Sequence, residues 1–430
     1  MTENAPSLGA SLPSAVVVIG GGISSAPPVP DAKLLAALPP GKRVLELGRP
    51  DSRMGDAYSQ QHPHAQWVRA DADAITLAKI EGPFDLLVLS NGLPSLAVLD
   101  VASTKMSPDS TLVAAIENAA SWASLAQLIE ADVDAVDTPL SPASAYKRLL
   151  DAGWMPTLAD QHVGLPPAAA LAAATAPLAD ALSVPRRTAD RTLGMARAIV
   201  QAVRGFDDAP RRAGQAQFSV VVPTTRETQL RANVERSPGL QEVNAQVISY
   251  RGARSPAEAL SQSLSHCNGD WVLFCHQDVY FPRGFGEQLN AVLAEVPANA
   301  RSSALFGFIG MGVNRATLAC EPAGFVIDRL HRASHPASDA VLSIDELAIV
   351  VARESIHHID PALGWHLWAT DLCLTAVSTH AVFPRIVRLP VFHNSSNDYV
   401  LPASFQDAAA TLRRKYPEFG PIHTLCGTLQ

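Results

Sequence analysis

The chain has 430 residues, of which 47% are hydrophobic and 17% are charged, and its formal net charge is −8. This composition is that of a globular protein and excludes a disordered one. The length is sufficient for two domains. Because the net charge is negative and no dense run of Lys and Arg occurs, we expect no nucleic-acid partner.

The cysteines and the N-terminus bear on where the protein works. The five cysteines are odd in number, irregularly spaced and without a Cys-x-x-Cys pair. This pattern favours neither a disulfide framework nor a structural zinc site, and it indicates a reducing compartment. The N-terminus is not basic, and the apolar residues 15–20 are too few to span a bilayer. We therefore expect a cytoplasmic protein with no transmembrane segment.

The first half of the chain alternates short apolar segments with helical stretches. Strands are expected at residues 15–20, 42–48, 84–90 and 112–118. Such alternation predicts a parallel α/β sheet. The sequence thus suggests an N-terminal segment with one strand at 1–40 and an α/β domain at 41–164.

An Ala-rich stretch follows and ends in apolar residues at helical spacing. These are Leu193, Ala196, Ile199, Val200 and Val203. The spacing predicts a helix packed against one of the domains, and residues 207–210 would end it. We interpret residues 165–215 as a helical connector.

A second α/β unit is predicted for residues 216–430. Strands are expected at 218–223, 246–250 and from Trp271, with a helix at 256–266. The strand at Trp271 ends abruptly in His276-Gln277-Asp278. Polar groups at the carboxyl end of a strand lie where open α/β sheets bind ligands. An imidazole and a carboxylate two residues apart on an extended segment point the same way, which suggests metal or phosphate-metal ligands.

From Phe218 to about Pro417, the chain resembles nucleotide-sugar glycosyltransferases of the GT-A fold, in particular the bacterial family-two-like group. The resemblance rests on segments that occur in the order expected for that group. They are residues 220–224 (opening strand and nucleotide-binding turn), 276–279 (HQDV in place of the Asp-x-Asp metal motif), 343–346, 365–374 and 392–395.

The resemblance implies roles for individual residues. Asp278 and His393 would hold Mn²⁺ or Mg²⁺, and Asp371 would be the catalytic base of an inverting transfer. The donor side would comprise Pro223, Thr224, Arg226, Arg254, His276 and Gln277, with either arginine holding the diphosphate. The acceptor side would comprise Asp345, Glu346, Trp365 and His366.

Ordinary structural roles compete with several of these assignments. His276 and Asp278 could cap the following turn, and Asp371 could cap a helix. His366 lies among aromatic residues, which is typical of a packed cluster. The chain also departs from the group's pattern, because His276 replaces the first aspartate and residues 250–255 differ from the usual nucleotide-contacting segment. The nucleotide therefore stays unassigned.

Residues 42 to about 160 resemble class I methyltransferases that bind S-adenosylmethionine. The similar segments are residues 44–48, 67–71, 84–91, 115–122 and 149–154. The resemblance implies that Glu46, Gly48 and Asp71 belong to a cofactor loop. That loop has one glycine where such loops have two or three, and Arg49 and Pro50 fill the space that the cofactor would need. We therefore expect a degenerate domain that does not bind S-adenosylmethionine.

The sequence thus predicts two Rossmann-like α/β domains, a methyltransferase-like sheet and a GT-A sheet, joined by a helical connector. The expected function is metal-dependent transfer of a sugar from a nucleotide-sugar donor to a glycan, lipid-linked or protein acceptor. Two alternatives stay open: a bifunctional methyltransferase–glycosyltransferase, and a non-catalytic scaffold in a polysaccharide or flagellar glycosylation assembly. A homo-oligomer is compatible with the sequence.

Overall fold

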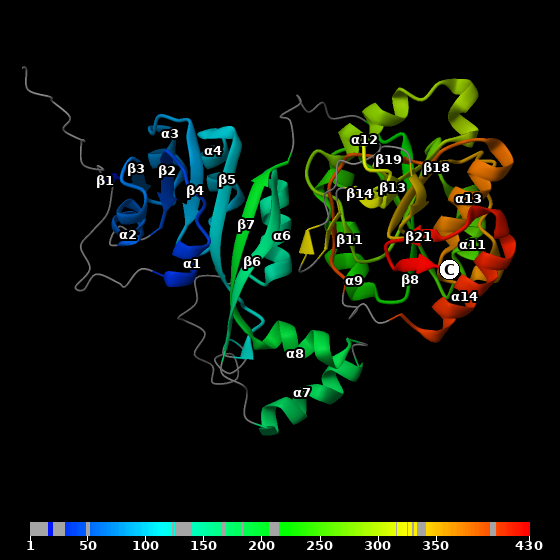
Figure 1. The fold of residues 1–430 in the computed structure, drawn as a ribbon, viewed down its shortest axis with the longest axis horizontal. Helices are drawn as coiled ribbons and strands as arrows, with labels where there is room; N and C mark the ends of the chain where they lie inside the picture. Colours follow the sequence, from blue (N-terminus) through cyan, green and yellow to red (C-terminus); the bar gives the residue numbers. More distant parts are fainter. Residues whose placement is uncertain are drawn as a thin grey trace, which may run out of the picture. The chain divides into compact units, whose positions relative to one another are not determined.

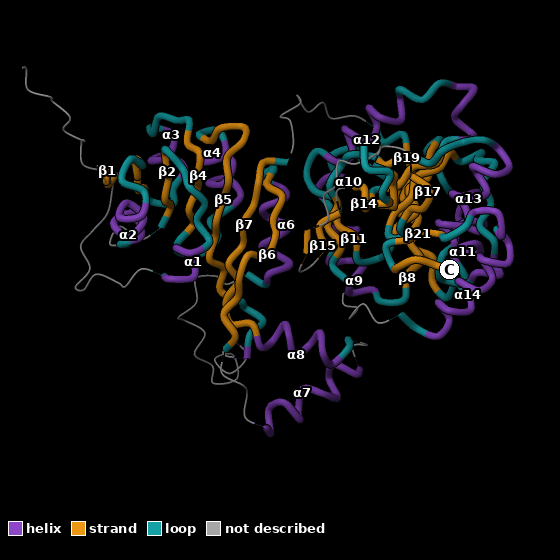
Figure 2. The backbone as a smooth tube through the Cα atoms, in the orientation of Figure 1, coloured by secondary structure: helices purple, strands orange, loops and turns teal. Residues whose placement is uncertain are grey.

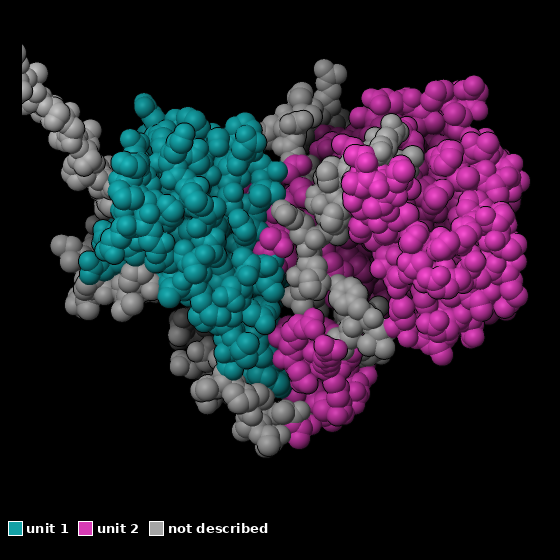
Figure 3. Space-filling view, viewed as in Figure 1, with its two compact units in different colours: residues 1–145, 158–166, 193–204 teal, residues 146–157, 167–192, 205–430 magenta. Residues whose placement is uncertain are grey.

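A computed structural model describes residues 16–19, 31–48, 52–122, 124, 140–164, 169–181, 184–205, 215–314, 316–324, 326–328, 331–332, 341–395 and 401–430. The predicted turn at 207–210 and the loop residues Arg49 and Pro50 lie outside this set. The chain divides into two compact units (Figure 3). Unit 1 comprises residues 1–145, 158–166 and 193–204, and unit 2 comprises residues 146–157, 167–192 and 205–430.

Unit 1 is built on a mostly parallel sheet. Its strands are β1 (Val16–Ile19), β2 (Arg43–Leu47), β3 (Gln66–Ala70), β4 (Phe84–Leu89), β5 (Met106–Glu117), β6 (Trp154–Val163, shared with unit 2) and β7 (Met195–Arg204). Its helices are α1 (Ala32–Ala36), α2 (Met54–Gln61), α3 (Ala74–Ala78), α4 (Leu96–Ser103) and the start of α6 (Pro142–Asp151). The strand order is β1-β3-β2-β4-β5-β7-β6 (Figure 1).

The parallel α/β sheet expected for the first half is present. Strands β1 to β5 pair in parallel, and the apolar runs predicted as strands are β1, β2, β4 and β5. Side chains of β2 to β5 form a core with α1 and α2 around the fully buried Trp67 and Leu34. The burial of β2 and β4 on both faces explains why these strands read as continuous apolar runs.

The helix predicted for residues 193–203 is wrong. Helix α8 (Arg186–Gly194) ends there and β7 begins, pairing antiparallel with β5 from Thr111↔Val203 to Glu117↔Arg197. Apolar residues at helical spacing also form a short apolar run, which a buried strand uses equally well. Burial of Ala198, Ile199 and Val200 in succession shows that both faces of this strand are covered.

Unit 2 contains a second mixed sheet and several small ones. Its strands are β8 (Phe218–Thr224), β9 (Gln246–Arg251), β10 (Trp271–Cys275), β11 (Val279–Tyr280), β12 (Leu305–Gly307), β13 (Ile309–Val313), β14 (Cys320–Gly324), β15 (Val326–Asp328), β16 (His331–Arg332), β17 (Val341–Ile344), β18 (Ala348–Ala352), β19 (Arg385–Ile386), β20 (Val391–His393), β21 (Ile422–Thr424) and β22 (Gly427–Leu429). Its α-helices are the rest of α6, then α7 (Ala169–Ala181), most of α8, α9 (Glu227–Ala232), α10 (Pro238–Gln241), α11 (Pro256–Ser263), α12 (Phe285–Ala294), α13 (Trp368–His380) and α14 (Ala403–Lys415). Short 3₁₀ turns are η2 (Val234–Arg236), η3 (Leu264–His266), η4 (Ala298–Ser303), η5 (Pro361–Leu363) and η6 (Pro417–Phe419).

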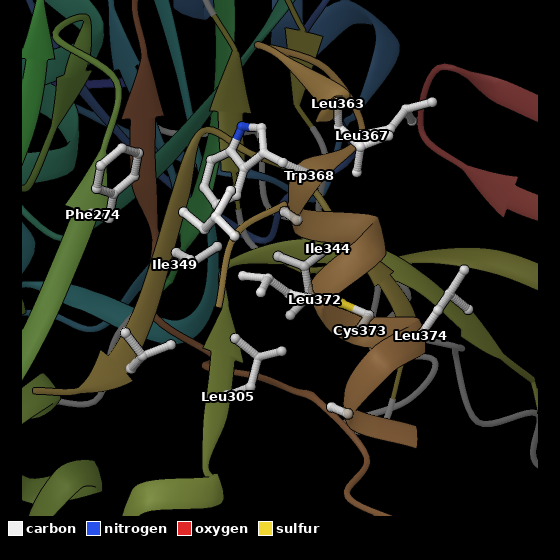
Figure 4. Packing of buried hydrophobic residues seen from close by; sticks show 14 of the residues in the cluster. Phe274, Leu305, Ile344, Ile349, Leu363, Leu367, Trp368, Leu372, Cys373 and Leu374 are labelled. Carbon is white, nitrogen blue, oxygen red and sulfur yellow. The ribbon is translucent and has the colours of Figure 1, made fainter. Parts of the chain in front are cut away.

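The main sheet of unit 2 has the order β19-β12-β18-β10-β8-β9. Strand β8 pairs in parallel with β9 and β10, and β18 is antiparallel to β10. Strands lie in the interior with helices around them (Figure 2). Helices α11, α13 and α14 pack on one face, where the Trp368 ring meets Phe274 edge-on at 5.4 Å (Figure 4). This face of the sheet is therefore covered by a hydrophobic core.

Both units are thus α/β, as the sequence predicts. Among the described helices, none is long and apolar enough to cross a membrane.

Candidate metal centre

The segment His276–Asp278 leaves the carboxyl end of a buried strand. All five residues of β10 are buried, and Cys275 pairs with Ala348 at the start of β18. The His276 N–H donates to the Leu347 carbonyl at 2.8 Å, and the chain then turns so that the Val279 N–H donates to the His276 carbonyl at 3.3 Å. The strand end and the turn together hold the polar residues at the edge of the sheet.

A distant segment brings His393 to the same place. Strand β20 pairs antiparallel with β11, so that His393 lies opposite Val279, and the Asn394 N–H donates to the Asp278 carbonyl at 2.8 Å. On its other side β20 pairs in parallel with β15, which places Asp328 beside His393. Backbone pairing of three short strands thus gathers these side chains.

The gathered side chains form a group that could hold a metal ion. One ligand atom each from His276, Asp278 and His393 lies within 4.8 Å of the others. His393 Nε2 is 3.5 Å from Asp278 Oδ1, while His393 Nδ1 is 3.1 Å from Asp328 Oδ2. With Nδ1 held by a carboxylate, Nε2 is the nitrogen left to bind a metal. Two imidazoles and a carboxylate are ligand types that can hold a divalent metal ion.

The charges of the cluster depend strongly on each other. Burial alone would lower the pKa of His393, but the carboxylates of Asp278 and Asp328 raise it well above its ordinary value. Burial would conversely raise the pKa of Asp278, and the His393 imidazolium instead lowers it below its ordinary value. His393 is therefore protonated near neutral pH when no metal is bound. Metal binding must displace that proton, so metal affinity should increase as the pH rises.

Asp328 is a residue that the sequence did not single out. The signal was weak, because it ends a three-residue strand and only cross-strand pairing shows its partner. Replacing Asp328 with Asn keeps the shape but weakens the hold on the His393 Nδ1–H. We expect Asp328→Asn to weaken Mn²⁺ binding about 10–100-fold, measured by isothermal titration calorimetry. Wild-type affinity in this variant would show that Asp328 does not orient His393.

Two adjacent acidic residues precede the strand that pairs with β10. Asp345 and Glu346 precede β18, whose first residue pairs with β10 just before His276. Partial desolvation lowers the pKa of His276, whereas the carboxylates of Asp278 and Asp345 act to raise it. The Asp345 carboxylate accepts the Leu347 N–H at 2.9 Å, which fixes the turn into β18.

Among the predicted acceptor-side residues, Glu346 has a buried carboxylate oxygen and a raised pKa. Burial and the neighbouring Asp345 raise its pKa to about 8, although hydrogen bonds from the backbone N–H groups of Leu367 and Ala369 act against this. Its Oε1 is buried and has no hydrogen-bond partner among the described residues. A carboxylate with a raised pKa and an unused oxygen is suited to accept a proton.

Asp371, the predicted base, lies in a different environment. Its side chain is 1% exposed, and its Oδ1 is 2.7 Å from both Lys415 Nζ and the Tyr416 hydroxyl. Lys415 also contacts Asp360 at 2.9 Å, so that Asp371 belongs to a network that fastens α14 to α13. An oxygen that already neutralises a lysine is a poor proton acceptor. Spacing along the chain does not show this lysine partner, and the role of Asp371 as a base stays a prediction.

The predicted donor-side residues lie at the same sheet edge as the cluster. Gln277 bridges the loops, because its Oε1 accepts the N–H groups of Thr225 and Arg226 at 2.9 and 2.7 Å. Pro223 and Thr224 end β8, and the Thr224 hydroxyl donates to the Val222 carbonyl at 3.1 Å. Gln277 thus shapes the turn that follows β8.

The remaining predicted residues are more exposed. Arg254 pairs with Glu258 at 3.1 Å on the first turn of α11, and its side chain is 88% exposed. Trp365 is exposed, and His366 Nε2 is 3.1 Å from the Ser404 hydroxyl. Arg254 is therefore engaged by a surface ion pair.

The structure describes Glu46, Gly48 and Asp71 of the predicted cofactor loop in unit 1, but not residues 49–51. Glu46 is fully buried, and its carboxylate accepts hydrogen bonds from Trp67 Nε1, Arg69 Nε and the Ser90 hydroxyl at 2.9, 3.0 and 2.7 Å. A Cβ at Gly48 would lie 2.2 Å from Ser90 Oγ, so the glycine makes room for a side chain of this unit. Asp71 is partly exposed beyond β3. We derive no methyl-transfer step from this arrangement.

Comparison with known proteins gives distant structural similarities. No protein-family model matches the chain, and no curated protein matches it. It is similar to the crystal structure of a SAM-dependent methyltransferase from Archaeoglobus fulgidus, with a TM-score of 0.27 and 15% identity over 38% of this chain and 86% of that one.

Two further structures are similar at the same level. The pyocyanin biosynthetic protein PhzM gives a TM-score of 0.25 and 14% identity over 38% of this chain and 50% of that one. Spermidine synthase from Thermotoga maritima gives a TM-score of 0.22 and 13% identity over 41% of this chain and 57% of that one. The chain thus spans about half the length of these two proteins, and at such values the similarity assigns it no activity.

Proposed function

We propose that unit 2 is a metal-dependent glycosyltransferase that transfers a sugar from a nucleotide-sugar donor to a hydroxyl acceptor. One observation carries the proposal: His276, Asp278 and His393 come from segments more than a hundred residues apart and meet at the carboxyl edge of β8 and β10. That edge is where open α/β sheets bind ligands. The resemblance of the sequence to GT-A enzymes supports the reaction class.

The residues of the cluster would hold the ion and the donor. His276, Asp278 and His393 Nε2 supply the ligands, and Asp328 keeps the His393 ring in place. A bound divalent ion would offset the negative charge that develops on a diphosphate leaving group. Gln277 keeps the turn after β8 in shape, so that backbone groups near Thr225 and Arg226 face the same edge.

Glu346 is the proposed base. An acceptor hydroxyl must lose its proton as it attacks the anomeric carbon, and a positioned carboxylate accepts it. The Oε1 of Glu346, which has no partner in the part of the chain that the structure describes, and its raised pKa suit that task better than the paired Asp371 does. Direct displacement with a single base would invert the anomeric configuration. Trp365 offers an exposed indole on which an acceptor sugar could stack.

The test is a thermal-shift panel with the full-length protein. Nucleoside diphosphates are added with and without Mn²⁺, and S-adenosylhomocysteine is added separately. We expect one nucleoside diphosphate to raise the melting temperature only with Mn²⁺, because a ligand that binds the folded state alone stabilises it. We expect no shift with S-adenosylhomocysteine.

Each contrary result points to a different function. The lack of any metal-dependent shift would contradict the proposal and favour a non-catalytic scaffold. A shift with S-adenosylhomocysteine would contradict the expectation of a degenerate methyltransferase-like domain and favour a bifunctional enzyme. The acceptor is proposed only as a class, namely a glycan, a lipid-linked glycan or a protein.

A further inference from the structure

The C-terminal half of α6 packs against the strands that carry the metal centre. Residues 146–157 belong to unit 2. The Tyr146 ring meets the Phe392 ring edge-on at 6.0 Å, and Phe392 directly precedes His393 on β20. This helix contributes no ligand to the centre, yet it contacts both β11 and β20.

Lys147 is the central polar residue of this contact. Its Nζ donates to the Ala232 carbonyl at 2.6 Å and to Asn233 Oδ1 at 2.7 Å, and it lies 4.8 Å from the centre of the Tyr280 ring. Burial lowers the pKa of Lys147 to about 8, against the effect of Asp151, so the amine is still mostly charged at neutral pH. Burying an ammonium group is costly unless it is well paired, and here carbonyl and amide oxygens pair it.

A chain of hydrogen bonds leads from Lys147 to the metal ligands. Asn233 is fully buried, and its Oδ1 also accepts from Asn394 Nδ2 at 3.3 Å. Asn394 follows His393, and its backbone N–H donates to the Asp278 carbonyl at 2.8 Å. The lysine and the backbone of Asp278 are therefore separated by two asparagines.

Asp151, also on α6, contacts β11 through Tyr280. Its Oδ2 accepts the Tyr280 hydroxyl at 2.8 Å, and Tyr280 lies two residues after Asp278. Its Oδ1 accepts the Arg283 N–H at 3.2 Å, while Arg283 Nε donates to the Asp151 carbonyl at 2.9 Å. Two residues of α6 thus hold Tyr280 of β11. Lys147 lies over the face of its ring, and Asp151 accepts its hydroxyl.

We propose that Lys147 is a positioning residue for the metal centre, acting through Asn233 and Asn394 on the backbone of Asp278 and on β20. The inference rests on the proposed metal site and names no new ligand. A centre assembled from two-residue and three-residue strands has little rigidity of its own. The buried amine of Lys147 adds rigidity, because it fixes Asn233 and, through it, Asn394 at the end of β20.

The experiment measures Mn²⁺ affinity of the full-length protein by isothermal titration calorimetry. Lys147→Met keeps the aliphatic stem and removes the donor. We expect the dissociation constant to rise about tenfold, the lower end of the effect of residues that support metal ligands. Lys105→Met is the matched control, because Lys105 Nζ donates to one carbonyl, that of Ala78, in unit 1. The Mn²⁺ affinity of Lys105→Met should equal that of the wild type.

A double-mutant cycle separates positioning from general destabilisation. Asn394→Ala removes the last side chain of the chain of hydrogen bonds and leaves the backbone N–H that reaches Asp278. Combined with Lys147→Met it should cost less affinity than the two single changes added together, because both interrupt one path. Additive losses, or wild-type affinity in Lys147→Met, would overturn the inference. If the wild type itself binds no Mn²⁺, the proposed function fails first.

Discussion

Replacement of Asp278 by alanine is expected to abolish metal-dependent turnover of a nucleotide-sugar donor while the protein stays folded. Asp278 is the carboxylate of the cluster, and its Oδ1 lies 3.5 Å from His393 Nε2, the other proposed ligand atom. Supporting residues around a metal typically change affinity 10–100-fold, so loss of a direct ligand should exceed about 100-fold. Donor turnover and Mn²⁺ titration both measure it.

A matched control lies at the other end of the same strand. Asp270 directly precedes β10, its side chain is 62% exposed, and it contacts Arg301 at 3.6 Å. Asp270→Ala should leave turnover and Mn²⁺ affinity unchanged, since exposed ion pairs contribute little. If Asp278→Ala turned over the donor at the wild-type rate, the metal assignment would be wrong. His393 retains Asp328 as its partner in the variant, which is why we expect the fold to survive.

The sequence was most informative where a strand ends in polar residues. A buried run followed by His276-Gln277-Asp278 places side chains at a sheet edge through local geometry alone. The position of His393 followed from the order of segments in the GT-A resemblance. Both residues lie at the cluster, because β11 and β20 pair immediately after the motif.

Features that depend on tertiary partners could not be predicted. Asp328 acts through a neighbour 65 residues away, and Asp371 is tied to Lys415, which no local pattern connects. The residues of β7 satisfy both helical spacing and a buried strand, and only the antiparallel pairing with β5 decides between them. Local pattern thus predicts secondary structure where the spacing of apolar residues fits only a helix or only a strand. Acid–base roles depend instead on contacts between residues far apart in the sequence.

The second large effect is expected at Glu346. Glu346→Gln should lower the rate of sugar transfer by about 10²–10⁴-fold, the usual contribution of a positioned general base, while Mn²⁺ affinity is retained. The glutamine keeps the size of the side chain and its carbonyl oxygen. Asp371→Asn is the matched comparison, because it also replaces a carboxylate by its amide. It should instead lower the melting temperature, since Lys415 and Tyr416 lose a charged partner.

The pH dependence separates the two carboxylates. Burial, followed by Asp345, raises the pKa of Glu346 to about 8, and only its ionised form accepts a proton. At saturating Mn²⁺ the wild-type rate should therefore rise with pH and level off above about pH 8, and Glu346→Gln should lack this rise.

Stability should change in the opposite direction, because the folded state binds the Glu346 proton more tightly than the unfolded chain does. The contribution of the protonated side chain is complete below the ordinary glutamate pKa and is lost as the pH increases toward 8. The glutamine variant should escape that loss and gain melting temperature relative to the wild type above pH 8. If Asp371→Asn removes the rise in rate and Glu346→Gln preserves it, the base is Asp371, and the ion pair with Lys415 must open during turnover.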